Sequence, residues 1–149
     1  MRLVTNLLAT FFGVGYFPIA PGTLASLIVV FLYKAGFHLL PWPFYLGIGL
    51  GIYLMGVWSS TLFAARRKKE DPRTVVIDEV LGQWLALFML PPSWGLVLLS
   101  FFLFRFFDII KPFFIKKAET FNAGWGIMLD DIVAGIYASI ILNLYLLVR

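Results

Sequence analysis

Long apolar segments, almost uninterrupted by charge, dominate this sequence. Four of them, residues 23–40, 44–65, 94–110 and 132–148, have 17 to 22 residues each. A helix of that length crosses the roughly 30 Å hydrocarbon core of a bilayer. Hydrophobic residues make up 61% of the chain and charged residues 13%, which is too apolar for a soluble domain to cover with polar surface. The sequence therefore predicts one integral membrane domain over residues 1–149, all-α in class.

Two further apolar segments do not match a full crossing. Residues 79–90 would extend only about 18 Å as a helix, so we expect a short helix with its polar start buried in protein. Residues 3–20 contain Gly13, Gly15 and Pro18 and predict an interfacial or re-entrant segment. The predicted fold is a polytopic transmembrane helical bundle with about five membrane-embedded helices, one of them short.

Basic residues concentrate in two connections between the apolar segments. Their members are Arg66, Arg67, Lys68, Lys69 and Arg73 in one connection, and Lys111, Lys116 and Lys117 in the other. The positive-inside rule places both on the cytoplasmic side, which agrees with five crossings. Four crossings with a re-entrant short segment would separate them onto opposite sides. Attraction to anionic lipid explains the net charge of +4 better than a nucleic-acid partner does.

Acidic residues are rare, and five of the eight lie against apolar segments. These five are Asp78, Glu79, Asp108, Asp130 and Asp131. The predicted topology brings all of them to the cytoplasmic ends of three helices. Helix capping explains a single acid at a helix start, but Asp108 lies near a predicted C-terminus, where the helix dipole disfavours it. Ionisable residues at membrane depth usually have a function, so we expect a site here.

The charge balance of these acids indicates a divalent cation. Five carboxylates face two nearby cations, Arg105 and Lys111, which leaves three negative charges unbalanced. The chain has no cysteine and one histidine, and a ligand set of oxygens favours Mg²⁺, Mn²⁺ or Ca²⁺ over Zn²⁺ or Cu²⁺. Adjacent acids from different helices suit Mg²⁺, which takes one or two carboxylates together with substrate phosphate. The predicted Mg²⁺ ligands are Asp78, Glu79, Asp130 and Asp131, with Asp108 as a further ligand or orienting group.

A row of charges precedes Pro112. Arg105, Asp108 and Lys111 are spaced three residues apart, so their side chains follow one helix face. One interpretation is an ion-pair ladder that ends the helix. The other is phosphate binding by Arg105 and Lys111, because a guanidinium donates two parallel hydrogen bonds to a phosphate.

Two glycine-containing loops are predicted on the same side. In the first, Thr23 follows Pro21-Gly22 and Ser26 comes three residues later. Thr23 suits a helix cap, and the free N–H groups of a helix start bind anions, so Thr23 and Ser26 are candidate phosphate-binding residues. In the second, Gly124-Trp125-Gly126 precedes Asp130. A turn and a cap alone explain either loop equally well.

Four motifs in order resemble the phosphatidylglycerophosphatase A family over nearly the whole chain. They are Gly13-x-Gly15-x-x-Pro18-x-x-Pro21-Gly22-Thr23-x-x-Ser26, Asp78-Glu79-x-x-Gly82, Arg105-x-x-Asp108-x-x-Lys111-Pro112 and Gly124-x-Gly126-Ile127-Met128-x-Asp130-Asp131-x-x-Ala134-Gly135. The chain departs from the family pattern at Ala25, Phe114 and Ala123, where Gly, Pro and Gly are usual. None of these differences removes a chargeable group.

The resemblance implies a Mg²⁺-dependent lipid phosphatase of the bacterial inner membrane with its site facing the cytoplasm. Its phospholipid substrate would be phosphatidylglycerophosphate, and its products phosphatidylglycerol and phosphate. We expect metal-assisted hydrolysis with Glu79 as general base. The absence of cysteine excludes a cysteinyl-phosphate, whereas a carboxylate nucleophile stays open. A small cation or proton carrier is an alternative, since buried acids also line ion paths, but the predicted crossings are almost wholly apolar at their middles. A lipid-headgroup transferase is a third option, although its long acidic motif is missing.

Overall fold

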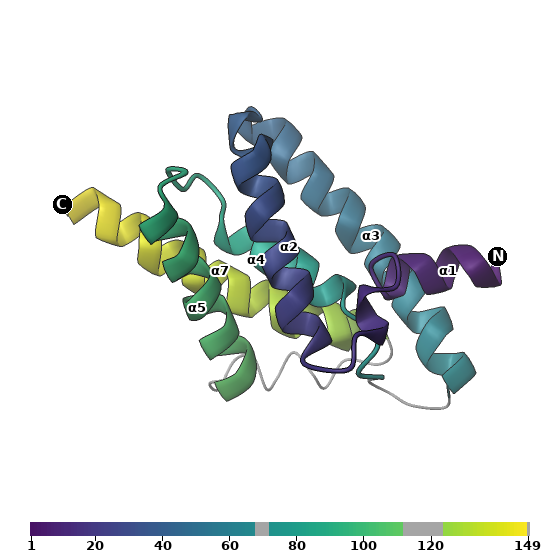
Figure 1. The fold of residues 1–149 in the computed structure, drawn as a ribbon. Helices are drawn as coiled ribbons and strands as arrows, with labels where there is room; N and C mark the ends of the chain where they lie inside the picture. Colours follow the sequence, from purple (N-terminus) through teal and green to yellow (C-terminus); the bar gives the residue numbers. More distant parts are fainter. Residues whose placement is uncertain (68–71, 112–123, 149) are drawn as a thin grey trace.

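The computed structural model describes residues 1–67, 72–111 and 124–148, and the regular structure in these residues is entirely helical (Figure 1). This confirms the predicted all-α class. The elements in chain order are α1 (Arg2–Ala9), the 3-10 turn η1 (Val14–Tyr16), α2 (Pro21–Ala35), the 3-10 turn η2 (Phe37–Leu39), α3 (Trp42–Arg67), α4 (Ile77–Ala86), α5 (Trp94–Ile110) and α7 (Gly124–Val148). Lys68, Lys69, Lys116 and Lys117 of the two basic connections, with Pro112, Phe114 and Ala123 of the motifs, lie outside the described residues.

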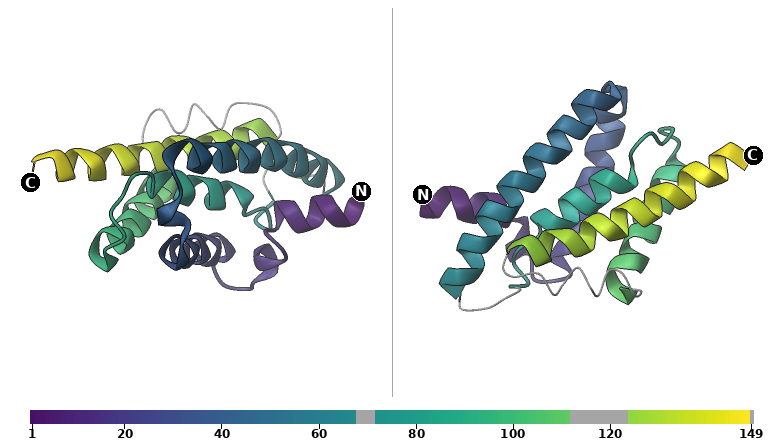
Figure 2. Two further views of the ribbon diagram at one scale, coloured as in Figure 1. Left: turned by 90° about the horizontal axis from the view of Figure 1, so that it is seen from above. Right: turned by 180° about the vertical axis from the view of Figure 1, so that it is seen from behind.

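The short helix α4 lies at the centre of the bundle. It packs against α2 on one side and against α3 and α7 on the other, with α5 beside it (Figure 2). Apolar side chains are buried around most of its circumference, as Val80, Leu81 and Trp84 show. The Trp84 indole nitrogen donates to the Tyr45 carbonyl at 3.1 Å, and the Tyr45 hydroxyl donates to the Trp84 carbonyl at 2.7 Å. Protein therefore surrounds α4, as predicted for a short helix with a buried polar start.

Glycines allow α4, α5 and α7 to approach closely. A Cβ atom on Gly135 of α7 would lie 2.2 Å from the carbonyl oxygen of Gly82 in α4, and one on Gly82 would lie 2.4 Å from the Phe104 ring of α5. Small residues at helix interfaces let backbones come into contact. Gly82 is one turn beyond Asp78, and Gly135 is one turn beyond Asp131, so this contact sets the distance between the two acids.

Two helices, α3 and α7, are long and apolar enough to cross a membrane. Helices α2 and α4 have 15 and 10 residues, which at 1.5 Å per residue extend about 22 and 15 Å, less than the hydrocarbon core. The predicted count of about five spans is therefore not confirmed. Large apolar side chains such as Leu50, Phe102 and Leu144 point outward from α3, α5 and α7, which is typical of a surface in contact with lipid.

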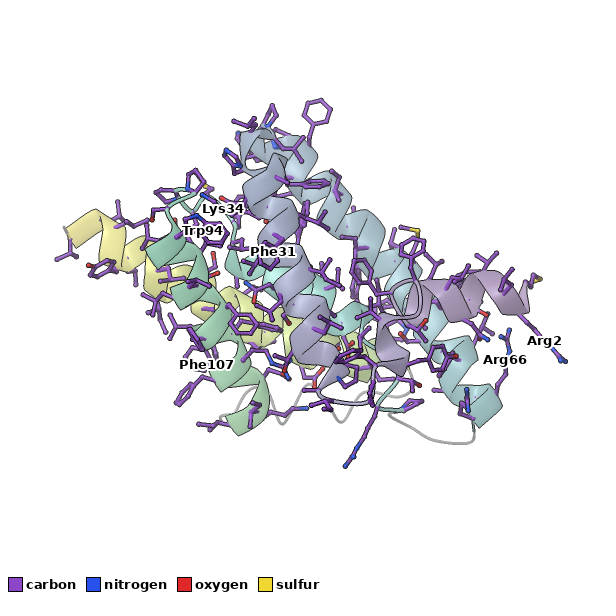
Figure 3. All side chains as sticks on the ribbon, viewed as in Figure 1. Arg2, Phe31, Lys34, Arg66, Trp94 and Phe107 are labelled. Carbon is purple, nitrogen blue, oxygen red and sulfur yellow. The ribbon has the colours of Figure 1, made fainter. Side chains whose placement is uncertain are left out.

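The N-terminal segment forms α1 and η1 instead of one continuous helix. Helix α1 buries Thr5 and Ala9 and exposes Leu3. The Arg66 guanidinium of α3 donates to the Thr5 hydroxyl at 2.8 Å. Figure 3 shows Arg66 near the N-terminal end of α1, where Arg2 is labelled. The Val76 amide donates to the Ala9 carbonyl at 2.9 Å. These contacts attach α1 to the bundle, while its predicted placement at the membrane interface stays a prediction.

Several helix boundaries differ from the predicted ones, and the short helix α4 ends at Ala86 instead of residue 90. Helix α2 begins at Pro21 with Ala20 as its N-cap and ends at Ala35, so Thr23 lies inside the first turn and the prediction that it caps the helix is wrong. Helix α7 begins at Gly124, eight residues before the predicted start at 132. The predicted loop 124–126 is its first turn, because Gly124 lets α7 lie against α3: a Cβ there would be 2.4 Å from the Val57 carbonyl oxygen.

Candidate active site

A polar cavity of about 500 Å³ opens where α2, α4 and α7 begin and α5 ends. Its lining includes all five acids singled out from the sequence, together with Arg105 and Lys111. The predicted convergence of these residues is thus confirmed within the described residues. Asp78 and Glu79 lie in the first turn of α4, as predicted, whereas Asp130 and Asp131 lie in the second turn of α7 instead of opening that helix.

Three carboxylates form the centre of the cavity. One oxygen from each of Asp78, Glu79 and Asp131 lies within 4.8 Å of the others. Asp78 Oδ1, Glu79 Oε2 and Asp131 Oδ2 are buried and have no hydrogen-bond partner in the described part of the chain. A buried anionic oxygen without a partner is costly, and neighbouring like charges add to that cost. The cluster therefore requires protons or a cation.

The remaining two acids of the cavity are paired with cations. Arg105 Nη1 lies 2.6 Å from Asp108 Oδ2 and 3.9 Å from Glu79 Oε1. Lys111 Nζ lies 2.7 Å from Asp130 Oδ2, and the Asp131 amide donates to Asp130 Oδ1 at 3.0 Å. Arg105 and Asp108 are thus neighbours on one helix face, as their spacing predicted. Asp108 and Asp130 use oxygens on these cations, while the three-carboxylate cluster keeps unsatisfied oxygens.

The cluster has the donor chemistry that a hard divalent cation requires. Carboxylate oxygens are the side-chain ligands that Mg²⁺ and Ca²⁺ prefer, and Asp78, Glu79 and Asp131 offer three from two helices. Gly22 leaves room for one of them, since a Cβ at this position would lie 1.8 Å from Glu79 Oε1. Asp130, the fourth predicted ligand, contacts Lys111, and its role as a metal ligand stays a prediction.

Thr23 and Ser26 are not among the residues that line the cavity in the described structure. The Ser26 hydroxyl is buried and donates to the Gly22 carbonyl at 3.0 Å. Because α2 starts at Pro21, its first turn presents Gly22 to the cavity in place of these hydroxyls. Their predicted phosphate-binding roles remain predictions without contact to the cavity.

Arg73 and five of the six residues 15–20 line the cavity, and none of them was predicted as a site residue. Arg73 belonged to a predicted basic connection, and its position five residues before Asp78 is the signal that would have marked it. In the segment 15–20, Gly15 and Pro18 belong to the first of the four motifs, and that motif is the signal for this side of the cavity. With Arg73 included, five carboxylates face three cations, and two negative charges remain unbalanced.

Polar residues elsewhere in the helices bind separate partners. The Lys34 ammonium lies 4.8 Å from the Trp94 ring centroid, at the end of α2 away from the cavity (Figure 3). Gln83 Nε2 donates to Ser100 Oγ at 3.2 Å, and Asn143 Nδ2 donates to a carbonyl of its own helix at 2.9 Å. Within the described ranges these groups do not form one polar path, which is what the carrier alternative would require.

The fold and the cavity define a helical, membrane-associated protein in which clustered carboxylates lie beside arginine and lysine. The model of the phosphatidylglycerophosphatase A family matches residues 7–146, and the chain belongs to this family. Family membership makes the chain a phosphoric monoester hydrolase that acts on a lipid phosphate.

Similar proteins agree with this assignment. Phosphatidylglycerophosphatase A of Escherichia coli (strain K12) is 39% identical over 145 residues, which cover 92% of this chain and 80% of the relative. The protein of the same name from Haemophilus influenzae is 38% identical, with 91% and 85% covered. A Bacteroides thetaiotaomicron protein named "Putative phosphatidylinositol-3-phosphatase" is 36% identical, with 91% and 89% covered. No solved structure matches the chain.

Proposed function

We propose that the chain hydrolyses the terminal phosphomonoester of phosphatidylglycerophosphate, giving phosphatidylglycerol and phosphate, in a Mg²⁺-dependent reaction at the cytoplasmic face of the bacterial inner membrane. The observation that supports this proposal most strongly is the trio of unpartnered carboxylate oxygens of Asp78, Glu79 and Asp131 beside Arg105 in one cavity. A carboxylate trio alone would repel a phosphate. The trio therefore implies a cation between the protein and the substrate.

Asp78, Glu79 and Asp131 would hold Mg²⁺ in this site. When bound, Mg²⁺ neutralises phosphate charge and makes a bound water more acidic. The protein supplies the remaining functions. The oxygens of the cluster are positioned by the α4–α7 contact at Gly82 and Gly135, so the site is built before substrate arrives and needs little reorganisation.

Arg105 and Lys111 are the groups that would bind the phosphoryl oxygens. Both line the cavity, and each is held by one carboxylate, Asp108 or Asp130. These ion pairs keep the cationic groups facing the cavity. In phosphoryl transfer, negative charge spreads over the three equatorial oxygens, and fixed cations stabilise it. Arg105 Nε is buried and has no hydrogen-bond partner among the described residues, so one donor of this guanidinium is unsatisfied.

Glu79 is our choice for the general base. One of its oxygens, Oε2, is unpartnered, and the other lies 3.9 Å from Arg105 Nη1. Its carboxylate is therefore close to the group that would bind the phosphate, and as a ligand of the metal it would also lie beside a metal-bound water. A base must lie within hydrogen-bond reach of the proton that it removes, and Glu79 lines the cavity in which the attacking water would be bound.

The location of the cavity suits a substrate that stays in the membrane. It opens at the helix ends that adjoin the two basic connections, and basic residues near a membrane attract anionic lipids at roughly 1 kcal/mol each. A headgroup at the interface would reach the acids while its acyl chains remain in lipid. The positive-inside rule supports the cytoplasmic orientation.

Phosphate release by the purified full-length protein in detergent tests the proposal. The substrates are phosphatidylglycerophosphate, phosphatidic acid and phosphatidylinositol 3-phosphate, each with Mg²⁺ or with EDTA. We expect Mg²⁺-dependent release from phosphatidylglycerophosphate in preference to the other two lipids. Release that is equal in EDTA would contradict the metal assignment. A protein that moves cations across liposomes but releases no phosphate would support the carrier alternative.

A further inference from the structure

We propose that Arg73 binds a second phosphate of the substrate, the phosphodiester that joins the headgroup to the diacylglycerol. This contact would make the cavity selective for lipids that carry a phosphomonoester beyond a phosphodiester. The inference rests on the proposed function and assigns a specificity-determining residue to the same cavity.

Arg73 differs from the other cations of the cavity in that no carboxylate of the described residues pairs with it. Arg105 and Lys111 each have a carboxylate oxygen within 2.7 Å. Arg73 also lines the cavity, but its side chain is exposed and makes no ion pair with an acid in the described residues. Its guanidinium is therefore available to an anionic ligand, and its planar fork suits a phosphate.

Arg73 lies beside the wall formed by residues 15–20. A Cβ on Gly15 would be only 1.9 Å from the carbonyl oxygen of Thr74, so the backbone next to Arg73 touches this wall directly. Five of the six residues of this wall line the cavity. The wall also carries two large apolar side chains that are exposed. Phe17 is 49% exposed and Ile19 is 76% exposed.

Phe17 lines the cavity and Ile19 does not, so exposed apolar side chains lead from the cavity to the outside of the protein, which suits the approach of a lipid. Exposed apolar patches of this kind mark sites of interaction with membranes or other apolar partners. Acyl chains would pass over Phe17 and Ile19, and the first phosphate to enter the cavity would then be near Arg73. The terminal monoester would bind at Arg105 of α5 and at the carboxylate cluster of α4 and α7.

The phosphodiester would thus bind at Arg73, and the terminal monoester would bind at Arg105 and the carboxylate cluster. A lipid with a monoester alone, such as phosphatidic acid, would bind at only one of these two places. Its single phosphate, when bound at Arg105, would leave Arg73 without a ligand. The cavity volume of about 500 Å³ lies within the usual range of small-ligand sites and accommodates a glycerol headgroup with both phosphates.

Steady-state kinetics of R73A, R73K and the control R67A test this inference on phosphatidylglycerophosphate in detergent. Arg67 is also exposed, lies in the last turn of α3 and is not among the residues lining the cavity, so R67A removes the same charge elsewhere. We expect R73A to raise KM by about 10- to 100-fold, the loss of a charge-assisted hydrogen bond, with kcat little changed. R73K should recover part of the loss, and R67A should behave like the wild type.

Inhibition by phosphatidylglycerol provides a readout independent of turnover, because this lipid keeps the phosphodiester and lacks the monoester. R73A should weaken this inhibition by a factor similar to its KM change and leave inhibition by inorganic phosphate unaltered. Equal KM changes in R73A and R67A would overturn the inference, as would unchanged inhibition by phosphatidylglycerol. A wild-type protein inactive on phosphatidylglycerophosphate would overturn the proposed function and this inference together, whereas an active wild type with an unaffected R73A overturns the inference alone.

Discussion

The contact between Gly82 and Gly135 offers the sharpest test of how the fold builds the site. A Cβ placed on Gly135 would be 2.2 Å from the Gly82 carbonyl oxygen, whereas ordinary van der Waals contact starts at 3.4 Å. The substitution Gly135→Ala therefore requires α4 and α7 to separate by 1.2 Å, the difference between these two distances. Because Asp78 and Asp131 lie one turn away on the same helices, their carboxylates must separate as well.

The expected magnitudes differ for stability and for catalysis. Overpacking of a well-packed interface costs about 1–3 kcal/mol of folding free energy, which the helical bundle should tolerate. A displacement of about 1 Å in a catalytic group lowers a rate by roughly 100-fold. We therefore expect Gly135→Ala to remain folded and to lose about two orders of magnitude in kcat, with a higher Mg²⁺ concentration needed for half-maximal activity.

Phosphate release and thermal unfolding in detergent, each measured over a series of Mg²⁺ concentrations, check this prediction. The matched control is Gly47→Ala in α3, since a Cβ there meets no atom within 4 Å and alanine favours a helix by about 0.5–1 kcal/mol over glycine. The control should keep full activity. Retention of more than about half of the activity by Gly135→Ala, or an equal loss in Gly47→Ala, would refute the argument that this contact sets the spacing of the acids.

Three further predictions concern individual contacts. Asp131→Asn should abolish phosphate release and the rise in melting temperature caused by Mg²⁺, while the metal-free protein is as stable as the wild type or more so, because a buried like charge is removed; calorimetry with and without Mg²⁺ checks this. Gly22→Ala should displace the Glu79 carboxylate, 1.8 Å from the new Cβ, and raise the Mg²⁺ requirement without unfolding the protein, as a Mg²⁺ titration of activity would show. Arg66→Ala removes the 2.8 Å hydrogen bond to Thr5, worth about 1 kcal/mol, so amide hydrogen exchange in residues 2–9 should accelerate while phosphate release changes little.

Local sequence patterns were sufficient to predict the helical class and several helix boundaries. The apolar segment 94–110 coincides with α5, because Ser93 and the preceding prolines mark its start and Lys111-Pro112 marks its end. Asp78 and Glu79 lie in the first turn of α4 as predicted. The spacing of Arg105 and Asp108 predicted their contact. In each case the cause lies within a few residues of the chain, so a short window of sequence contains it.

Contacts between distant residues account for the boundaries that were predicted incorrectly. Gly124 was placed in a loop, since glycine usually breaks a helix, but its contact with Val57 on α3 stabilises a helical turn there. The consequence is functional: Asp131 is moved into the second turn of α7 and becomes 2% exposed. Capping explains an acid at a helix start, but not one buried at this depth.

The sequence by itself determined that this chain forms apolar helices, that its few acids gather at one end of them, and that its motifs are those of a lipid phosphatase family. Hydrophobicity and residue spacing are local properties, and they suffice for these conclusions. Tertiary structure decided which carboxylates form the unpartnered trio, which are paired with Arg105 and Lys111, and that Arg73 lines the same cavity. Those outcomes depend on contacts of a few ångströms between helices far apart in the chain, and glycines at the crossings, not the charged residues themselves, set those distances.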